Sequence, residues 1–222
     1  MAPNDEFIRE VDEEYRRDQL AKIWNRYSGV IVGAALFIVA AVGGWRYWEH
    51  AQETRAQAAA VQYEDALKLS REEKGKEAEA ALEALAKDGT GYSLLSRFRL
   101  AAELSRQNAE NGASAYDALA NDASVDPLWQ DLARLRAAWL RIDTADPTQV
   151  RPALERLAVP TNAWRHSARE LLGLSGLKAN DMDYAGRWFD QIAADRETPA
   201  GLRQRLAIYT SLVAGGPVQV TQ

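Results

Sequence analysis

The sequence predicts an all-α protein in which a single N-terminal transmembrane helix precedes an α-solenoid of paired helices. Three observations predict this fold class. Ala and Leu are abundant while β-branched residues are sparse, which favours helices over strands. An uncharged run, residues 28–44, lies near the N-terminus. A pattern of aromatic, small and basic residues then recurs three times in the rest of the chain.

The apolar segment 27–48 is long enough to cross a membrane, because a helix of about 20 residues spans the roughly 30 Å hydrocarbon layer. Aromatic residues lie at both ends of the run, which is typical of the two membrane interfaces. Arg46 can extend its guanidinium group toward water. A buried core helix is the alternative, but such helices seldom have aromatic residues at both ends. The expected interface residues are Trp24, Tyr27, Trp45, Arg46, Tyr47 and Trp48.

We expect this segment to remain as an anchor. A cleaved signal has a short basic leader, whereas residues 1–26 are longer and carry many acidic side chains. Lys and Arg near the ends of a span decide its orientation, and they are more numerous before this one than after it. We therefore expect residues 1–26 in the cytoplasm and the domain 49–214 outside it. A domain without cysteine suits a bacterial periplasm, which places the span in the inner membrane.

Small residues recur at four-residue steps on one face of the span. This spacing allows a second helix to approach closely within the lipid. Gly and Ala are also common in any transmembrane helix, so chance spacing is the alternative. Whether the second helix belongs to a copy of the same chain is left open. The predicted contact residues are Gly29, Gly33, Ala40 and Gly44.

The region 49–214 repeats a pattern that begins at Tyr92, Trp129 and Trp164. Each segment has a small residue four positions later, an arginine at five and a second small residue at nine. A period near 34 residues with paired helices is the tetratricopeptide arrangement, and an irregular helical bundle is the alternative. The repeated residues are Ser96, Arg97 and Ala101, then Ala133, Arg134 and Ala138, then Ala168, Arg169 and Gly173.

The sequence also makes predictions for the first helix pair, for the middle unit and for the C-terminal end of the repeat region. Helices 49–71 and 77–86 form a first pair, and Pro152 should make the second helix of the middle unit start late and stay short. Residues 215–222 should be a tail. A final helix, 198–213, should cap the array with inward side chains at Leu202, Leu206, Tyr209 and Leu212.

Partner binding is expected on the first helix of each pair, which lines the concave face of such arrays. An exposed aromatic or aliphatic group there suits a peptide that buries its own apolar side chains. Packing of Trp139 inside the repeat core is the alternative. The predicted partner groove contains Phe98, Leu135, Trp139, Ile142 and Leu174.

Composition and motifs exclude several function classes. A net charge of −5 argues against a nucleic-acid binder. The absence of cysteine excludes disulfides, thiol nucleophiles and cysteine zinc sites. His50 and His166 are far apart, and no zinc-protease, phosphate-loop or serine-hydrolase motif is present. We expect no catalytic residue, no metal site and no cofactor.

The stretch "GGWRYWEHAQ", residues 43–52, resembles the ancillary subunit of the SecYEG translocon, the YfgM-like family. The helix "SLLSRFRLAAEL" after Tyr92 is also similar. The resemblance implies a single-span inner-membrane protein with a periplasmic tetratricopeptide-like domain and no catalytic activity. It also implies SecYEG and a membrane-anchored periplasmic chaperone (PpiD-like) as partners, beside the lipid bilayer. A cell-envelope scaffold that coordinates division or wall synthesis is the competing interpretation.

Overall fold

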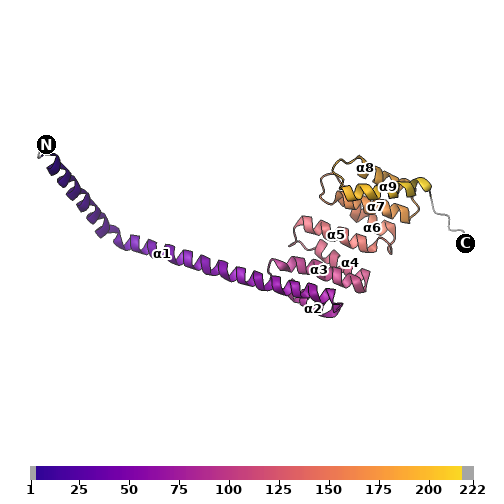
Figure 1. The fold of residues 1–222 in the computed structure, drawn as a ribbon, viewed down its shortest axis with the longest axis horizontal. Helices are drawn as coiled ribbons and strands as arrows, with labels where there is room; N and C mark the ends of the chain where they lie inside the picture. Colours follow the sequence, from indigo (N-terminus) through magenta and orange to yellow (C-terminus); the bar gives the residue numbers. More distant parts are fainter. Residues whose placement is uncertain (1–3, 217–222) are drawn as a thin grey trace. The chain divides into compact units, whose positions relative to one another are not determined.

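The computed structural model describes the backbone of residues 4–216; residues 1–3 and 217–222 lie outside the described part, as does most of the expected tail 215–222. The side chains of residues 1–15, 18–20, 23 and 31 are also outside it. Within 4–216 every regular element is a helix (Figure 1), which confirms the all-α fold class. The helices are α1 (Asn4–Arg71), α2 (Gly75–Ala86), α3 (Tyr92–Gln107), α4 (Ala109–Ala120), α5 (Pro127–Arg141), α6 (Pro147–Leu157), α7 (Arg165–Lys178), α8 (Met182–Ala194) and α9 (Ala200–Gly215).

The chain divides into two compact units, Met1–Gln57 and Ala58–Gln222, and α1 contributes to both. From Trp24 onward, α1 contains a stretch with a mean hydropathy of 2.0 that is long and apolar enough to cross a membrane. None of that stretch is buried in the structure, which argues against a core helix. A Cβ atom added to Gly29, Gly33 or Gly44 would meet no atom within 4 Å, so these positions are open for another helix to approach.

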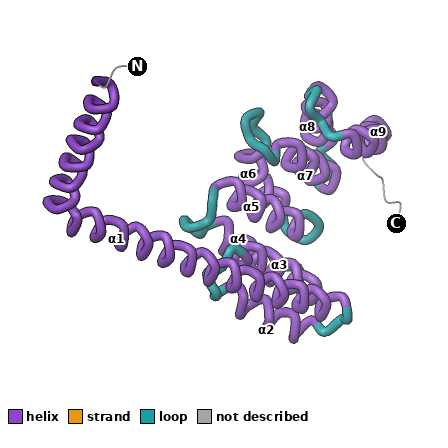
Figure 2. The backbone as a smooth tube through the Cα atoms, turned by 60° about the vertical axis from the view of Figure 1, so that its left-hand side comes forward, coloured by secondary structure: helices purple, strands orange, loops and turns teal. Residues whose placement is uncertain are grey.

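In the second unit, α2 to α9 stack in chain order, and each helix packs against the next (Figure 1). Short loops join these helices (Figure 2). Within each pair, the first helix is longer than the second. The pairs are α3 with α4, α5 with α6 and α7 with α8. These are the paired helices that the repeated pattern predicts.

The small residues of the repeated pattern lie where the helices cross. Ser96, Ala101, Ala133 and Ala168 are fully buried, and Ala138 is nearly so. A small side chain at a crossing allows two backbones to approach and gain dispersion contacts. The recurring small residues in the sequence therefore mark the points at which neighbouring helices pack in the core.

The second helix of each pair also follows a common pattern. Asn108, Asp146 and Asp181 precede α4, α6 and α8, and each side chain accepts a hydrogen bond from a backbone N–H in the first turn. Such caps satisfy N–H groups that have no partner in the helix. Buried residues follow four, eight and eleven positions after each cap: Gly112, Tyr116 and Leu119; Val150, Leu154 and Leu157; Ala185, Phe189 and Ile192.

Two expectations for the second unit are wrong. The helix α6 is short but does not start late: it begins at Pro147 and contains Pro152. The proline removes a bond to the carbonyl of Thr148, and both residues are exposed, so water can replace that bond. Leu212 on α9 is 50% exposed, whereas Val213 packs against the core. No helix follows α9 in the described residues, so nothing there covers its outer face.

Candidate partner-binding surface

The repeated arginines tie the ends of helices together. The Nη2 atom of Arg134 donates to the carbonyl of Ala120 at 2.6 Å, at the end of α4. One repeat later, Nε of Arg169 donates to the carbonyl of Ala158 at 3.0 Å, just after α6. Carbonyls at helix ends have no partner within the helix, and the partial negative charge there favours a cation. These two arginines therefore join each first helix to the preceding second helix.

Two of the repeated arginines also form ion pairs with the loop that follows their own unit. Arg97 lies 2.7 Å from Asp122, after α4, and Arg169 lies 3.0 Å from Asp195, after α8. These interactions explain why an arginine recurs at the same position of each unit. Its guanidinium group is bound within the chain and is not available to a ligand.

A cleft of about 260 Å³ opens on the first-helix side of the array, between α5, α7 and α9. Four of its residues follow the spacing of one helix face on α5. We call it the Trp139 cleft. Its lining consists of Leu132, Leu135, Arg136 and Trp139 from α5, then Trp164, Ser167, Glu170, Leu171 and Arg205.

Trp139 and Leu135 have different roles in this cleft. Leu135 is 8% exposed and belongs to the core cluster of the middle repeat, so it forms the floor. Trp139 is 55% exposed and displays its ring to solvent. Removing such a ring from water on contact with a partner provides a large apolar gain. The ring of Trp139 therefore lies largely outside the core of the repeat.

Charged groups surround the ring. Arg136 is exposed, and no carboxylate of the described residues lies within ion-pair distance of it. Glu170 is buried and accepts hydrogen bonds from Nε and Nη2 of Arg205 at 2.8 and 2.9 Å. Tyr209 donates to the same carboxylate at 2.8 Å. Burial is the main cause that raises the pKa of Tyr209, and the hydrogen bond to Glu170 raises it further. The cleft thus combines an apolar ring, an arginine without an acidic partner among the described side chains, and a carboxylate that is paired with Arg205.

The other predicted groove residues lie elsewhere. Phe98 packs against Tyr116 and Trp129, with ring centroids 5.9 and 5.6 Å away, in the core of the preceding unit. Ile142 and Leu174 are partly buried against the cluster that contains Leu135. Of the five predicted residues, the structure brings only Leu135 and Trp139 into the cleft.

Seven of the nine residues that line the cleft were not predicted from the sequence, and three of them illustrate why. Arg136 lies between Leu135 and Trp139 on the same helix face, so its position follows from the same periodicity. Trp164 was recognised only as a marker of the repeat, yet its ring also lines the cleft, and its Nε1 donates to the carbonyl of Leu128 at 3.0 Å. Arg205 comes from α9, and no local pattern indicates that it reaches this site.

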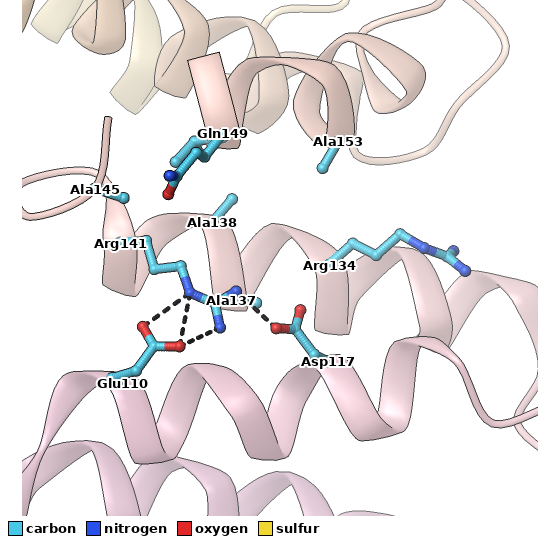
Figure 3. Close-up of a pocket in the computed structure, with 10 residues that line it drawn as sticks. Glu110, Asp117, Arg134, Ala137, Ala138, Arg141, Ala145, Gln149 and Ala153 are labelled. Atoms are coloured by element: carbon cyan, nitrogen blue, oxygen red, sulfur yellow. Dashed lines mark hydrogen bonds and ion pairs between the residues drawn. The ribbon is translucent and has the colours of Figure 1, made fainter. Parts of the chain in front are cut away.

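A second, larger hollow of about 430 Å³ lies between α4, α5 and α6 (Figure 3). Arg141 of α5 reaches from its floor to two acids on α4. Its Nε lies 2.9 Å from Glu110, and its Nη1 lies 2.6 Å from Asp117. The hydrogen bond to Arg141 lowers the pKa of Glu110. The guanidinium is thus held in place at the wall of the hollow.

The two histidines do not form part of either surface. His50 is exposed on α1, and His166 on α7 has its Nδ1 3.8 Å from Asp195. Burial, followed by the charge of Arg165, lowers the pKa of His166. Among the residues whose side chains are described, no group of three His, Asp or Glu residues is placed to hold a metal ion.

The family model for the tetratricopeptide repeat-like domain matches residues 22–207. The chain belongs to this family. The match starts before the apolar segment, so the family's domain includes that segment as well as the helix pairs. Tetratricopeptide repeat-like domains are typically non-catalytic modules for protein–protein interaction. No curated relative and no solved structure matches the chain.

Proposed function

We propose that this tetratricopeptide repeat-like protein is a membrane-anchored, non-enzymatic interaction module that acts as an ancillary subunit of the SecYEG translocon. It would link the channel to periplasmic chaperones during protein export. The observation that carries the proposal is the joint presence of an apolar, unburied helix and a repeat domain within one family match. The resemblance of residues 43–52 to the YfgM-like family points to the translocon in particular.

The anchor in this proposal spans the bacterial inner membrane with residues 1–26 in the cytoplasm. Trp45, Tyr47 and Trp48 are all strongly exposed on α1, so they make no core of their own and suit the lipid headgroup region. Trp24 and Tyr27 are exposed at the other end of the apolar run. The two aromatic sets would mark the two interfaces and hold the repeat domain at the periplasmic surface.

The repeat domain captures partners through the Trp139 cleft in this proposal. A segment with an apolar side chain covers the exposed ring of Trp139, and an acidic group beside it pairs with Arg136. Chaperones and emerging polypeptides both present such segments. A binding module that moves clients between partners needs contacts of this modest size rather than a deep pocket.

Copurification tests the proposal. The tagged full-length chain is extracted in mild detergent, and its partners are identified by mass spectrometry. Recovery of SecY together with a membrane-anchored periplasmic chaperone supports the proposal. Recovery of division or wall-synthesis proteins instead would support the envelope scaffold. Both partner sets should depend on an intact repeat domain, and Trp139→Ala should weaken capture while Val61→Ala, at an exposed residue of α1, should not.

A further inference from the structure

The hollow around Arg141 lies on the face of α5 opposite the Trp139 cleft. At about 100° per residue, Ala137, Ala138 and Arg141 lie on the side of α5 opposite to Leu132, Leu135 and Trp139. The two surfaces therefore cannot hold the same segment of a partner. We call the second one the Arg141 hollow. It lies over α5 and between the second helices α4 and α6 (Figure 3).

Comparison with the next repeat explains why the hollow exists. Gly173 and Gly176 allow α8 to lie directly on α7: an added Cβ would be 2.2 Å from the ring of Phe189 and 2.7 Å from the backbone of Ala185. The repeat spacing places Ala138 and Arg141 at these positions on α5. Their larger side chains keep α6 from approaching α5 as closely, and space remains between the helices.

In the next repeat the corresponding gap, between α6 and α8, is filled by aromatic side chains. Tyr184 donates from its hydroxyl to Glu155 at 2.9 Å, across the gap. The guanidinium of Arg151 lies 3.8 Å from the centre of the same ring. Trp188 packs edge-on against it, with ring centroids 6.1 Å apart. In this protein, the gap between successive second helices is thus closed by an aromatic ring that contacts both an arginine and an acid.

The Arg141 hollow has the acid and an arginine, here supplied by the first helix α5 rather than by the second helix, but it lacks the ring. Counted from the caps Asp146 and Asp181, Gln149 stands where Tyr184 stands, and Ala153 stands where Trp188 stands. Both line the hollow from α6 (Figure 3). Neither can fill it as the aromatic pair does.

The acid that would meet an aromatic hydroxyl is also in place. Counted from Asn108 and Asp146, Asp117 on α4 has the position that Glu155 has on α6. Arg141 occupies Oδ2 of Asp117, and a carboxylate accepts further hydrogen bonds at its other oxygen. The Asp117 side chain remains 43% exposed, so a hydroxyl can reach it.

We propose that the Arg141 hollow docks a tyrosine side chain presented by a partner protein. The ring lies against Ala138 and Ala153 with its face toward the guanidinium of Arg141, and its hydroxyl donates to Asp117. The partner thereby supplies the group that Tyr184 supplies in the next repeat. Cation–π contact and the hydroxyl bond favour tyrosine over phenylalanine. This surface is separate from the Trp139 cleft and adds a second contact to the proposed function.

Methyl NMR of the full-length chain in detergent micelles tests the proposal, with N-acetyl-L-tyrosinamide as the probe. With ¹³C-labelled alanine methyl groups, the signals of Ala137, Ala138 and Ala153 should shift and saturate as the probe is added. The signals of Ala78 on α2 and Ala185 on α8, which are fully buried away from the hollow, should not move. N-acetyl-L-phenylalaninamide should bind more weakly, and Asp117→Ala, which removes the acceptor of the hydroxyl, should abolish that preference.

Filling the hollow from within provides the matched variants. Ala153→Trp installs the side chain that the next repeat has at this position, so it should remove the tyrosinamide shifts at Ala137 and Ala138. Arg156→Trp, at an exposed residue of the same helix that does not line the hollow, should leave them unchanged. If Ala153→Trp fails to fold, Gln149→Tyr serves the same purpose.

Several outcomes would overturn the assignment. If the indole N–H signal of Trp139 in a ¹⁵N-labelled sample shifts and the three alanine signals do not, the probe binds in the other cleft. Absence of saturable shifts at the three alanines of the wild-type chain, or shifts that survive filling of the hollow, would show that no ring binds there. Because the probe contains no translocon component, these results are independent of the copurification result.

Discussion

Gly173 on α7 lies in direct contact with the ring of Phe189 on α8, at a crossing where a Cβ atom would come within 2.2 Å of Cε1. Phe189 is fully buried, and its ring stacks on Tyr209 of α9, with ring centroids 5.0 Å apart. The ring is therefore held by both neighbouring helices and has little room to accommodate a methyl group. This crossing joins three successive helices, so its packing should matter for the stability of the whole C-terminal end.

Gly173→Ala should destabilise the protein by about 1–3 kcal/mol, because overpacking of a tight core forces side chains and backbone to shift. Alanine is favoured over glycine within a helix by up to about 1 kcal/mol, so the clash must outweigh that gain. The matched control is Gly186→Ala on α8, where the added Cβ meets only Val213, at 3.5 Å. Thermal unfolding of the full-length chain in detergent, followed by circular dichroism, measures both. Equal melting temperatures for the two variants would contradict the close crossing.

Trp139→Ala should leave stability nearly unchanged while weakening partner capture. Its ring is largely exposed, so truncation creates no cavity and returns little apolar surface to water. Leu154→Ala is the contrasting variant: this side chain is fully buried in the same repeat, and its loss should cost about 2–5 kcal/mol. A fall in melting temperature for Trp139→Ala that approaches that of Leu154→Ala would assign the tryptophan to the core.

The helix pairs could be predicted from the sequence because their spacing is local. Small residues recur at the crossings, for example Ala133 and Ala168, and a helical period converts that recurrence directly into a buried stripe. The exposure of Trp139 could not be fixed in the same way. A shift of one residue in register rotates a side chain by about 100°, which is enough to exchange core for surface.

The Arg141 hollow was not predicted, because it depends on a comparison between units rather than on any motif. It follows from Ala138 where the next unit has Gly173, and from Ala153 where the next unit has Trp188. Each residue alone is ordinary in a helix. Leu212 was predicted to face inward for a related reason: apolar periodicity shows that a face could pack but not whether another helix covers it.

Acid should destabilise the repeat domain through Asp195. The backbone N–H of Glu197 and then Arg165 lower the pKa of Asp195 to about 2, against about 3.9 in an unfolded chain. Because the folded-state pKa is the lower one, the unfolded state binds more protons, and stability increases with pH in this window. The contribution is complete above about pH 4 and is lost as the pH falls toward 2.

Melting temperatures of wild type and Asp195→Asn between about pH 5 and 2 measure this effect. The wild type should lose more than the variant over that window. Asp143→Asn, at an exposed carboxylate that forms no ion pair with any described side chain, is the control and should keep the wild-type slope. If the melting temperatures of wild type and Asp195→Asn change equally with pH, Asp195 is not the cause of the loss of stability in acid.

Topology follows from the charges that flank the span. A reporter that is active only in the periplasm, fused after Gln222, should be active, and the same reporter fused before Met1 should be silent. Lys and Arg on the N-terminal side, such as Lys22 and Arg26, favour retention of that side in the cytoplasm. Activity of the N-terminal fusion would reverse the proposed orientation and would place the Trp139 cleft in the cytoplasm.

Gly33→Leu should weaken copurification with membrane partners if the small residues of the span form a contact face. An added Cβ at Gly33 meets no atom of the chain, so the change cannot disturb the chain's own packing, and leucine inserts into a membrane at least as well as glycine. A bulky side chain would instead separate two helices that approach in lipid and remove their dispersion contacts. A loss of only ~0.7 kcal/mol would reduce the bound fraction about threefold at low occupancy.

Ala35→Leu is the matched control, because it adds a leucine about 200° away, on the opposite face of α1. Both variants should insert equally, as judged by their amounts in the membrane fraction. Copurification of SecY and of the periplasmic chaperone, normalised to the amount of bait, should then fall for Gly33→Leu and stay constant for Ala35→Leu. If both variants retain their partners in full, the repeat domain alone makes the contact and the span serves only as an anchor.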